Sequence, residues 1–158
     1  MWVDWTARIA VVLAGIAGGP APDGDLLAAA SGLRGPVPGP VEARVVRVMD
    51  GDTLLVRARP WVGVEVETRV RILGIDAPEL HGACEEERRL AAKAKDLLEA
   101  SVAGGPVFLH EVRDDKYGGR VLARVATAAG TDCAQTLIGA GLARPYGGRK
   151  RQPWCPPP

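Results

Sequence analysis

Residues 43–59 read ARVVRVMDGDTLLVRAR. β-Branched and aliphatic side chains dominate both ends of this stretch, which favours one strand over 43–49 and a second over 53–59. The intervening triplet at 50–52 contains the Asp-Gly dipeptide that is common in tight hairpin turns. The stretch therefore predicts an antiparallel hairpin, and the rest of the fold can be built outward from it.

The sequence after this hairpin predicts further strands and helices. Apolar and polar residues alternate over 66–75, which indicates a third strand. The remaining patterns predict a helix over 88–104, strands over 106–113 and 120–127, and a helix over 131–143 that begins at Thr131 or Asp132. This order is typical of an α+β, mainly β fold: a five-stranded OB-fold barrel with two or three packed helices.

Length and composition are those of one soluble globular domain. The chain has 158 residues, of which 47% are hydrophobic and 25% are charged. Its 20 basic and 19 acidic residues give a net charge of +1, which excludes a strongly polybasic protein but leaves room for a local basic cleft that binds nucleic acid. The sequence has no CxxC pair, so a zinc site is not expected.

Residues 1–40 differ from the rest of the chain. Their apolar run from Ile9, IAVVLAGIAGG, is shorter than the roughly 20 residues that span a bilayer, and small residues follow it. The pattern indicates a signal peptide with an A-x-A cleavage site at 28–30, and hence export to the periplasm or the medium. An uncleaved leader would anchor the protein in a membrane, and a Gly/Pro/Ala-rich tail without a targeting role is the remaining alternative.

The domain boundaries follow from composition. GPVPGP at 35–40 is read as a linker, so residues 1–40 form a leader and linker and the folded domain spans 41–146. A basic, proline-rich tail follows at 147–158. The RKR triplet at 149–151 either contacts a nucleic-acid backbone or keeps the tail soluble, and the sequence favours neither reading.

Residues suited to phosphate chemistry follow the first and third predicted strands. Asp52 ends the first turn, while Asp76 and Glu79 lie on a segment stiffened by proline. If the barrel brings Asp52 and Asp76 to one rim, their carboxylates offer the oxygen ligands that calcium requires. Glu79 could then act as a base on water, and Arg71 could bind a phosphate through its planar donor fork. Each of these residues also has a purely structural alternative. Asp52 could simply belong to a hairpin turn, Glu79 could be a solvated loop acid, and Arg71 could be an exposed strand arginine.

Four motifs together resemble one known family. DGDTL, RVRILGIDAPE, DKYGGRVLARV and LIGAGLARPY occur in the order and approximate spacing of the staphylococcal nuclease (thermonuclease) family, from about Val41 to Tyr146. The resemblance implies an OB barrel that uses Ca²⁺ to hydrolyse phosphodiester bonds of DNA and RNA, leaving 3′-phosphate ends. We expect a monomer that acts on single-stranded or flexible nucleic acid and has no stable protein partner.

The resemblance also implies a role for residues of the first two motifs. Asp52 and Asp76, with the backbone carbonyl of Ala77, look like the calcium ligands. Glu79 looks like the residue that activates or orients the attacking water. Arg71 looks like one of two arginines that stabilise the pentacoordinate phosphate, where a well-aimed donor is worth about 3 kcal/mol.

The remaining motifs supply the second arginine and the substrate contacts. Arg120 looks like the second arginine, although this chain has two glycines at 118–119 where the family has one. The arginine–x–leucine–alanine order that follows argues that the added glycine enlarges the turn or makes a bulge, so Arg120 keeps its strand register. Lys116 and Tyr117 look like contacts to the substrate end. Tyr146 stands alone where the family prototype has paired tyrosines.

The three cysteines, at positions 84, 133 and 155, allow one disulfide and one free thiol. In an exported protein, Cys84 and Cys155 could form a disulfide that pins the tail across the domain, while Cys133 is expected to be buried and free.

The alternative function is a non-catalytic OB-fold module that binds nucleic acid or a partner. Family domains of that kind usually lose the acidic and arginine positions, which this sequence keeps. A membrane-tethered interaction domain is a weaker third reading.

Overall fold

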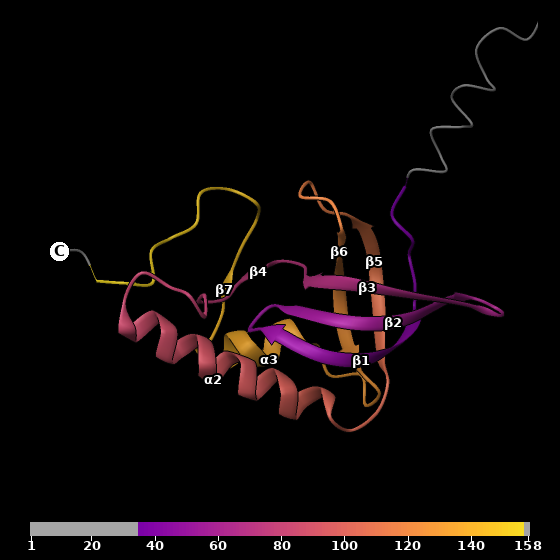
Figure 1. The fold of residues 1–158 in the computed structure, drawn as a ribbon, viewed down its shortest axis with the longest axis horizontal. Coiled ribbons are helices and arrows are strands. Elements are labelled where there is room, and N and C mark those ends of the chain that lie inside the picture. The colour runs from indigo at the N-terminus through magenta and orange to yellow at the C-terminus, as the bar shows by residue number, and fades with distance from the viewer. Residues whose placement is uncertain (1–34, 157–158) are drawn as a thin grey trace, which may run out of the picture. The chain divides into compact units, whose positions relative to one another are not determined.

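A computed structural model describes residues 35–156, and Figure 1 shows the course of the chain. Its elements are β1 (Val41–Asp50), β2 (Thr53–Trp61), β3 (Val64–Ile72), β4 (Ile75–Asp76), α2 (Glu85–Val102), β5 (Val107–Asp114), β6 (Arg120–Thr127), α3 (Cys133–Gly139) and β7 (Arg144–Pro145). Five strands close into a barrel in the order β1-β2-β3-β6-β5, while β4 and β7 form a two-stranded sheet. The predicted five-stranded, mainly β barrel of the OB type is confirmed.

The register of the barrel brings the end of β3 beside the first hairpin. β1 and β2 pair antiparallel, with Asp50 opposite Thr53 across the turn. On the other side of β2, Thr53 lies opposite Arg71 of β3. The amide of Ile72 also donates a hydrogen bond to the Asp52 carbonyl at 2.8 Å. Strand pairing alone therefore makes Asp52 and Arg71 neighbours.

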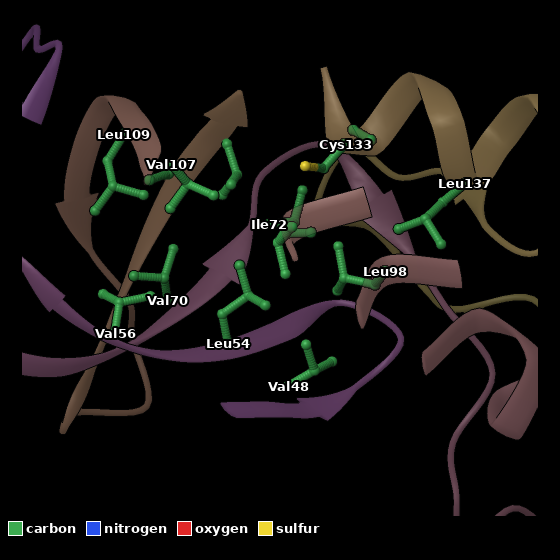
Figure 2. Close-up of a cluster of buried hydrophobic side chains, with 14 of the residues drawn as sticks. Val48, Leu54, Val56, Val70, Ile72, Leu98, Val107, Leu109, Cys133 and Leu137 are labelled. Carbon is green, nitrogen blue, oxygen red and sulfur yellow. The ribbon is translucent and has the colours of Figure 1, made fainter. Parts of the chain in front are cut away.

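Aliphatic side chains from the strands and both helices fill the barrel core, as Figure 2 shows. The fully buried members include Leu54, Val56, Val70, Ile72, Leu98, Val107, Leu109, Val125 and Leu137. Burying one such side chain stabilises the fold by about 1.5–3 kcal/mol. Leu98 of α2 and Leu137 of α3 therefore contribute to packing the two helices against the barrel.

Gly51 lies in the β1–β2 turn at a point where other parts of the chain approach closely. A Cβ atom at this position would lie 2.7 Å from the Cβ of Ala94 in α2 and 3.0 Å from the Cβ of Ala77 after β4. Both distances are shorter than ordinary van der Waals contact, so only glycine fits without movement. The packing of the turn against these two alanines fixes the position from which Asp52 projects.

We expect Gly51→Ala to lower the free energy of unfolding by about 1–3 kcal/mol, because the added methyl group meets two alanine Cβ atoms that move only with their backbone. Denaturant unfolding measures the effect. Gly139→Ala is the matched control, because a Cβ atom there meets nothing within 4 Å. Equal unfolding midpoints for Gly51→Ala and the parent protein would show that the turn is not close-packed.

The strand expected over 66–75 is divided in the structure, so that prediction was wrong in its extent. β3 begins earlier, at Val64, and a turn at residues 73–74 separates it from β4. Gly74 adopts a φ of +83°, a backbone conformation that residues with side chains rarely adopt. The break lets β4 leave the barrel and pair with β7, where Asp76 lies opposite Arg144.

The helix expected over 88–104 begins earlier, at Glu85, and ends at Val102. The loop predicted over 76–87 is shorter for the same reason. Cys84 has extended backbone angles at the N-cap, and the three acidic residues that follow it suit the positive end of the helix dipole. The three consecutive glutamates were therefore the sequence signal from which the earlier start of this helix could have been predicted.

The helix expected over 131–143 is shorter, because α3 ends at Gly139. Asp132, one of the two expected N-caps, accepts hydrogen bonds from the amides of Ala134 and Gln135. At the other end Gly141 has a φ of +70°, and its amide donates to the Ile138 carbonyl at 2.9 Å. This glycine C-cap terminates the helix before the apolar pattern ends.

The segment at 35–40, expected to be a plain linker, is partly attached to the barrel. Val37 pairs with Val112 through two backbone hydrogen bonds of 2.8 Å each. Contacts with the barrel therefore extend ahead of Val41, where the domain was expected to start. The proposed signal peptide falls on residues 1–34, outside the described residues. Within the described residues, no helix has the length and hydropathy needed to cross a membrane.

Candidate active site

Asp52 is a buried carboxylate at the end of the β1–β2 turn, with 4% of its surface exposed. The Thr53 hydroxyl donates to its Oδ1 at 2.9 Å, and its own amide donates to Oδ1 of Asp50 at 3.1 Å. Its Oδ2 lies 2.9 Å from Nη2 of Arg71. These contacts hold the carboxylate at the rim of the barrel, facing the end of β3.

Asp76 is a second buried carboxylate, also with 4% of its surface exposed, and it ends β4. Its Oδ1 lies 3.8 Å from the same Arg71 Nη2 atom. Arg71 therefore stands between the two carboxylates, and the structure brings together three residues that the sequence assigned to one site. Ala77 follows directly, and its amide approaches Oδ2 of Asp52 at 3.5 Å. The expectation that the Ala77 backbone carbonyl binds the cation stays a prediction.

Burial raises the pKa of Asp52 to about 7, since desolvation disfavours its charged form. Arg71 lowers the pKa, while the nearby Asp50 carboxylate raises it further. The protein cations that face Asp52 therefore do not fully compensate its negative charge. A buried carboxylate of this kind is stabilised by an additional cation.

The raised pKa predicts how the metal-free protein responds to pH. The unfolded chain loses the Asp52 proton near pH 3.8, whereas the folded protein keeps it to about pH 7. Raising the pH through this window therefore favours the unfolded state. From about pH 5 to about pH 7, in chelator, the wild type should lose about 1–2 kcal/mol more unfolding free energy than Asp52→Asn. Denaturant unfolding at both values tests this, and equal losses would contradict it.

Glu79 lies on the loop after β4 and is half-exposed, in contrast with the two buried aspartates. Its amide donates to Oε1 of Glu87 at 3.4 Å, and the amide of Ala83 donates to Oε2 of Glu87 at 3.0 Å. A Cβ atom at Gly82 would lie within 2.6 Å of the Glu87 side chain. The buried Glu87 carboxylate therefore folds the loop that presents Glu79.

Arg120 begins β6 and makes its ion pair with Asp115 of the preceding loop, not with Asp52 or Asp76. Its guanidinium lies 5.1 Å from the centre of the Tyr117 ring, and the ammonium of Lys116 lies 4.9 Å from the same ring. The two expected substrate contacts thus sit beside Arg120 at the β5–β6 hairpin, and the Tyr117 side chain is largely exposed.

Strand register places Arg120 on the same face as Arg71. β3 and β6 pair in parallel, with Arg69 opposite Arg120 and Arg71 opposite Leu122. Neighbouring strands with this offset put the Cα atoms of Arg120 and Arg71 about 8 Å apart. Their long side chains can therefore reach one phosphate from two strands.

Both glycines of the pair at 118–119 lie in the hairpin turn before β6. Gly118 and Gly119 have φ values of +54° and +67°, and both lie before the first residue of β6. The register shift in this strand pair falls on β5 instead, between His110 and Arg113. Arg120 is therefore the first residue of β6, opposite Arg69 of β3, and its agreement with the family's register stays a prediction.

The segment at 149–155, here called the strap, lies on the acidic cluster formed by Asp52, Asp76 and Glu79. Arg151 forms ion pairs with Oδ1 of Asp76 and Oε1 of Glu79. The Trp154 indole donates to Oδ2 of Asp76 at 3.3 Å. Of the two readings of the basic triplet, neither anticipated this contact with the proposed site.

The cysteines anchor the strap. Cys84 and Cys155, the pair expected to bridge, are joined by a disulfide in the structure. Cys133 is a buried free thiol whose pKa is raised to about 11 by burial, with a further contribution from Asp132. Tyr146 lies at the base of the strap, and its hydroxyl donates to the Arg149 carbonyl at 2.6 Å.

Sequence reasoning missed three residues of this site: Glu87, Arg151 and Trp154. Glu87 is one of three consecutive glutamates, and only the helix start decides which of them faces the loop. Arg151 and Trp154 are separated from Asp76 by 75 and 78 residues. The expected disulfide was the one sequence signal that could have drawn attention to them.

The acidic cluster and its surroundings fit a hard divalent cation. The ionisable groups in contact are four carboxylates and two guanidinium groups, from Asp50, Asp52, Asp76, Glu79, Arg71 and Arg151. With all of them ionised, the net charge of minus two equals the charge that one divalent cation neutralises. The carboxylate oxygens are the ligands that Ca²⁺ or Mg²⁺ prefers, and Asp52 and Asp76 bring them from two separate segments of the chain.

The same region matches a known family. Residues 69–153, more than half of the chain, match the family described as staphylococcal nuclease homologue. The chain belongs to this family. The matched region begins in β3 and includes Arg71, Asp76, Glu79 and Arg120, while Asp52 lies outside it, before β2.

Curated relatives of this nuclease-homologue chain come from Escherichia coli. One, described as an uncharacterized endonuclease, is 32% identical over 106 residues, which cover 67% of this chain and 61% of the relative. A second with the same description, from Escherichia coli O157:H7, has the same identity and coverage. The chain thus spans about three-fifths of the length of these relatives.

Proposed function

We propose that this protein is a calcium-dependent nuclease that hydrolyses phosphodiester bonds of DNA and RNA. The observation that carries the proposal is the convergence of Asp52, Asp76 and Arg71 at one rim of the barrel, with both carboxylates buried. Two buried carboxylates with an arginine between them suit a site where a cation and a phosphate meet. Membership of the nuclease-homologue family and the endonuclease description of the relatives point the same way.

Asp52 and Asp76, with the Ala77 carbonyl, would hold the cation. When bound, calcium supplies a positive charge that polarises the phosphate and favours ionisation of nearby water. Every other role in the reaction falls to side chains of this chain.

Glu79 supplies the base in this proposal. Its side chain is 46% exposed beside the buried aspartates, so it can meet a water molecule that approaches with the substrate. It takes a proton from this water, or orients it, as the oxygen attacks phosphorus in line. The bond from phosphorus to the 5′ oxygen breaks, this oxygen takes up a proton from solvent water, and the phosphate stays on the 3′ side. Glu79 must first exchange its ion pair with Arg151 for the water.

Arg71 and Arg120 stabilise the charge that develops on the phosphate oxygens. They project from neighbouring parallel strands on one face of the barrel, so they approach the phosphate from two sides. Tyr117 and Lys116 lie beside Arg120 and would contact the substrate near a sugar, base or terminal phosphate. Tyr146 has its hydroxyl bonded to the strap, so stacking on a base through its ring is the role left to it.

A second candidate function is a binding module without catalysis. The ion pairs of Arg151 with Asp76 and Glu79 favour this candidate, because they occupy a proposed cation ligand and the proposed base. The module would bind single strands without cutting them.

We further propose export by residues 1–40. A disulfide between Cys84 and Cys155 is the state expected in an oxidising compartment. N-terminal sequencing of the protein recovered from culture medium and periplasm tests this, and recovery of the intact chain from the cytoplasm alone would contradict it.

Product analysis separates the two functions. The full chain is incubated with end-labelled single-stranded DNA and RNA in calcium, and the products are analysed by mass spectrometry. The nuclease predicts shortened strands that end in 3′-phosphate. Intact strands that nevertheless co-purify with the protein would support the binding module, and 5′-phosphate products would contradict the proposed direction of cleavage.

A further inference from the structure

The strap is fixed to the domain at its start and near its end. At its start the Tyr146 hydroxyl donates to the Arg149 carbonyl at 2.6 Å. Near its end Arg144 of β7 donates to the Pro153 carbonyl at 3.1 Å, and its guanidinium lies 3.8 Å from the centre of the Trp154 ring. A segment held in this way stays near the acidic cluster even when an individual contact opens.

The Cys84–Cys155 disulfide adds a covalent attachment at the last residue of the strap. It joins the strap to the N-cap of α2, at the end of the loop that carries Glu79. A tether of this kind makes closure intramolecular and raises the effective concentration of the strap at the site. The yellow C-terminal segment of Figure 1 returns in this way toward the start of α2.

Arg151 sits where a cation would act. Its guanidinium pairs with Oδ1 of Asp76 and with Oε1 of Glu79, while Trp154 takes Oδ2 of Asp76 at 3.3 Å. Both oxygens of Asp76 therefore have a partner from the strap. A guanidinium and a divalent cation that share one carboxylate repel each other, and the guanidinium also removes one unit of negative charge from the cluster.

We propose that the strap is an intramolecular competitor for the cation, in which Arg151 occupies Asp76 and Glu79 until a divalent cation displaces it. This inference rests on the proposed function, since it takes Asp76 as a cation ligand. Displacement frees Glu79 at the same moment, so cation binding and exposure of the base are coupled. The Cys84–Cys155 disulfide sets how strongly the strap competes.

Calcium titration by calorimetry tests the proposal on chelator-treated full chain. Arg151→Gln should bind Ca²⁺ at least about threefold more tightly than the wild type. A strap that leaves the site free in only about one-third of wild-type molecules raises the apparent dissociation constant about threefold, and the substitution removes this effect. Arg149→Gln is the matched control, because it removes the same charge from the same segment and Arg149 forms no ion pair within the described residues. Its affinity should equal that of the wild type.

The Cys84→Ser/Cys155→Ser variant tests the tether separately. It should also bind calcium more tightly, and hydrogen exchange of residues 149–155 in chelator should be faster than in the wild type, whether or not any substrate is present. Because this variant removes a disulfide, circular dichroism must show that it folds. If it does not fold, Arg151→Gln with the disulfide intact decides the question.

The outcomes distinguish the inference from the function on which it rests. Equal calcium affinities of Arg151→Gln and the wild type overturn the competitor while leaving the nuclease in place. Weaker calcium binding by Arg151→Gln, or slower cleavage at unchanged calcium affinity, would assign Arg151 to the substrate site. Either result would also overturn the competitor. Calcium binding by none of the proteins overturns the calcium site itself, and the competitor with it.

Discussion

Glu79→Gln should lower the rate of phosphodiester cleavage by about 10²–10⁴-fold, the range that removal of a general base produces. Glutamine keeps the size of the side chain and can still donate or accept a hydrogen bond, but it cannot take a proton from the attacking water. The fold should be unaffected, since the side chain is half-exposed and the Glu79 amide, not its carboxylate, contacts Glu87. Single-turnover cleavage of labelled single-stranded DNA at saturating calcium measures the effect.

Glu85→Gln provides the control for this substitution. It makes the same chemical change at an exposed position at the start of α2, and its cleavage rate should match that of the wild type. Calcium affinity must be measured for both variants, because Glu79→Gln also removes a partner of Arg151. A rate within a few-fold of the wild type for Glu79→Gln would remove Glu79 from the role of base.

Arg120→Ala should slow cleavage by about 10²–10³-fold, as loss of one donor to a charged transition state does. Arg120 pairs with Asp115 and lies beside Tyr117, so its guanidinium is held at the hairpin and not between the carboxylates. The loss should fall on the chemical step more than on calcium binding. Single-turnover cleavage, combined with calcium titration, separates these two effects.

Arg124→Ala on the same strand is the control, because its guanidinium pairs with Glu111 and Asp132 at the surface. Exposed ion pairs contribute roughly 0–1 kcal/mol, so this variant should keep both its fold and its cleavage rate. An unchanged rate in Arg120→Ala would show that the arginine does not reach the phosphate. The second glycine of the pair at 118–119 would then be the first explanation to examine, and a variant that lacks one of these glycines would be the next to test.

The parts of the fold that sequence predicted best are those decided by local pattern. The 43–59 hairpin follows from β-branched runs on either side of an Asp-Gly turn, and strand pairing then places Asp52 beside Arg71. The first two motifs were informative because strand pairing brings the β1–β2 turn beside the end of β3. Both glycines before Arg120 have positive φ and lie in the turn, which agrees with the expectation that the added residue falls outside the strand.

The parts that sequence did not predict depend on contacts between distant segments. Nothing local distinguishes Arg151 from its basic neighbours in the tail; its role comes from a chain path that returns to Asp76 after 75 residues. Glu87 likewise becomes a buried acceptor only because α2 begins at Glu85. The strand expected over 66–75 was interrupted by one glycine conformation that alternating hydrophobicity does not report.

The central claim is that the acidic cluster binds calcium in order to cleave a phosphodiester bond. The most direct measurement follows the cleavage rate of a short single-stranded DNA by the full chain, as free calcium is raised from a chelator-buffered zero to saturation. We expect no cleavage in chelator and a rate that rises to a plateau, with half-saturation at the dissociation constant found by calorimetry. Cleavage that is equally fast in chelator, or bound but uncut DNA at every calcium concentration, would contradict the account.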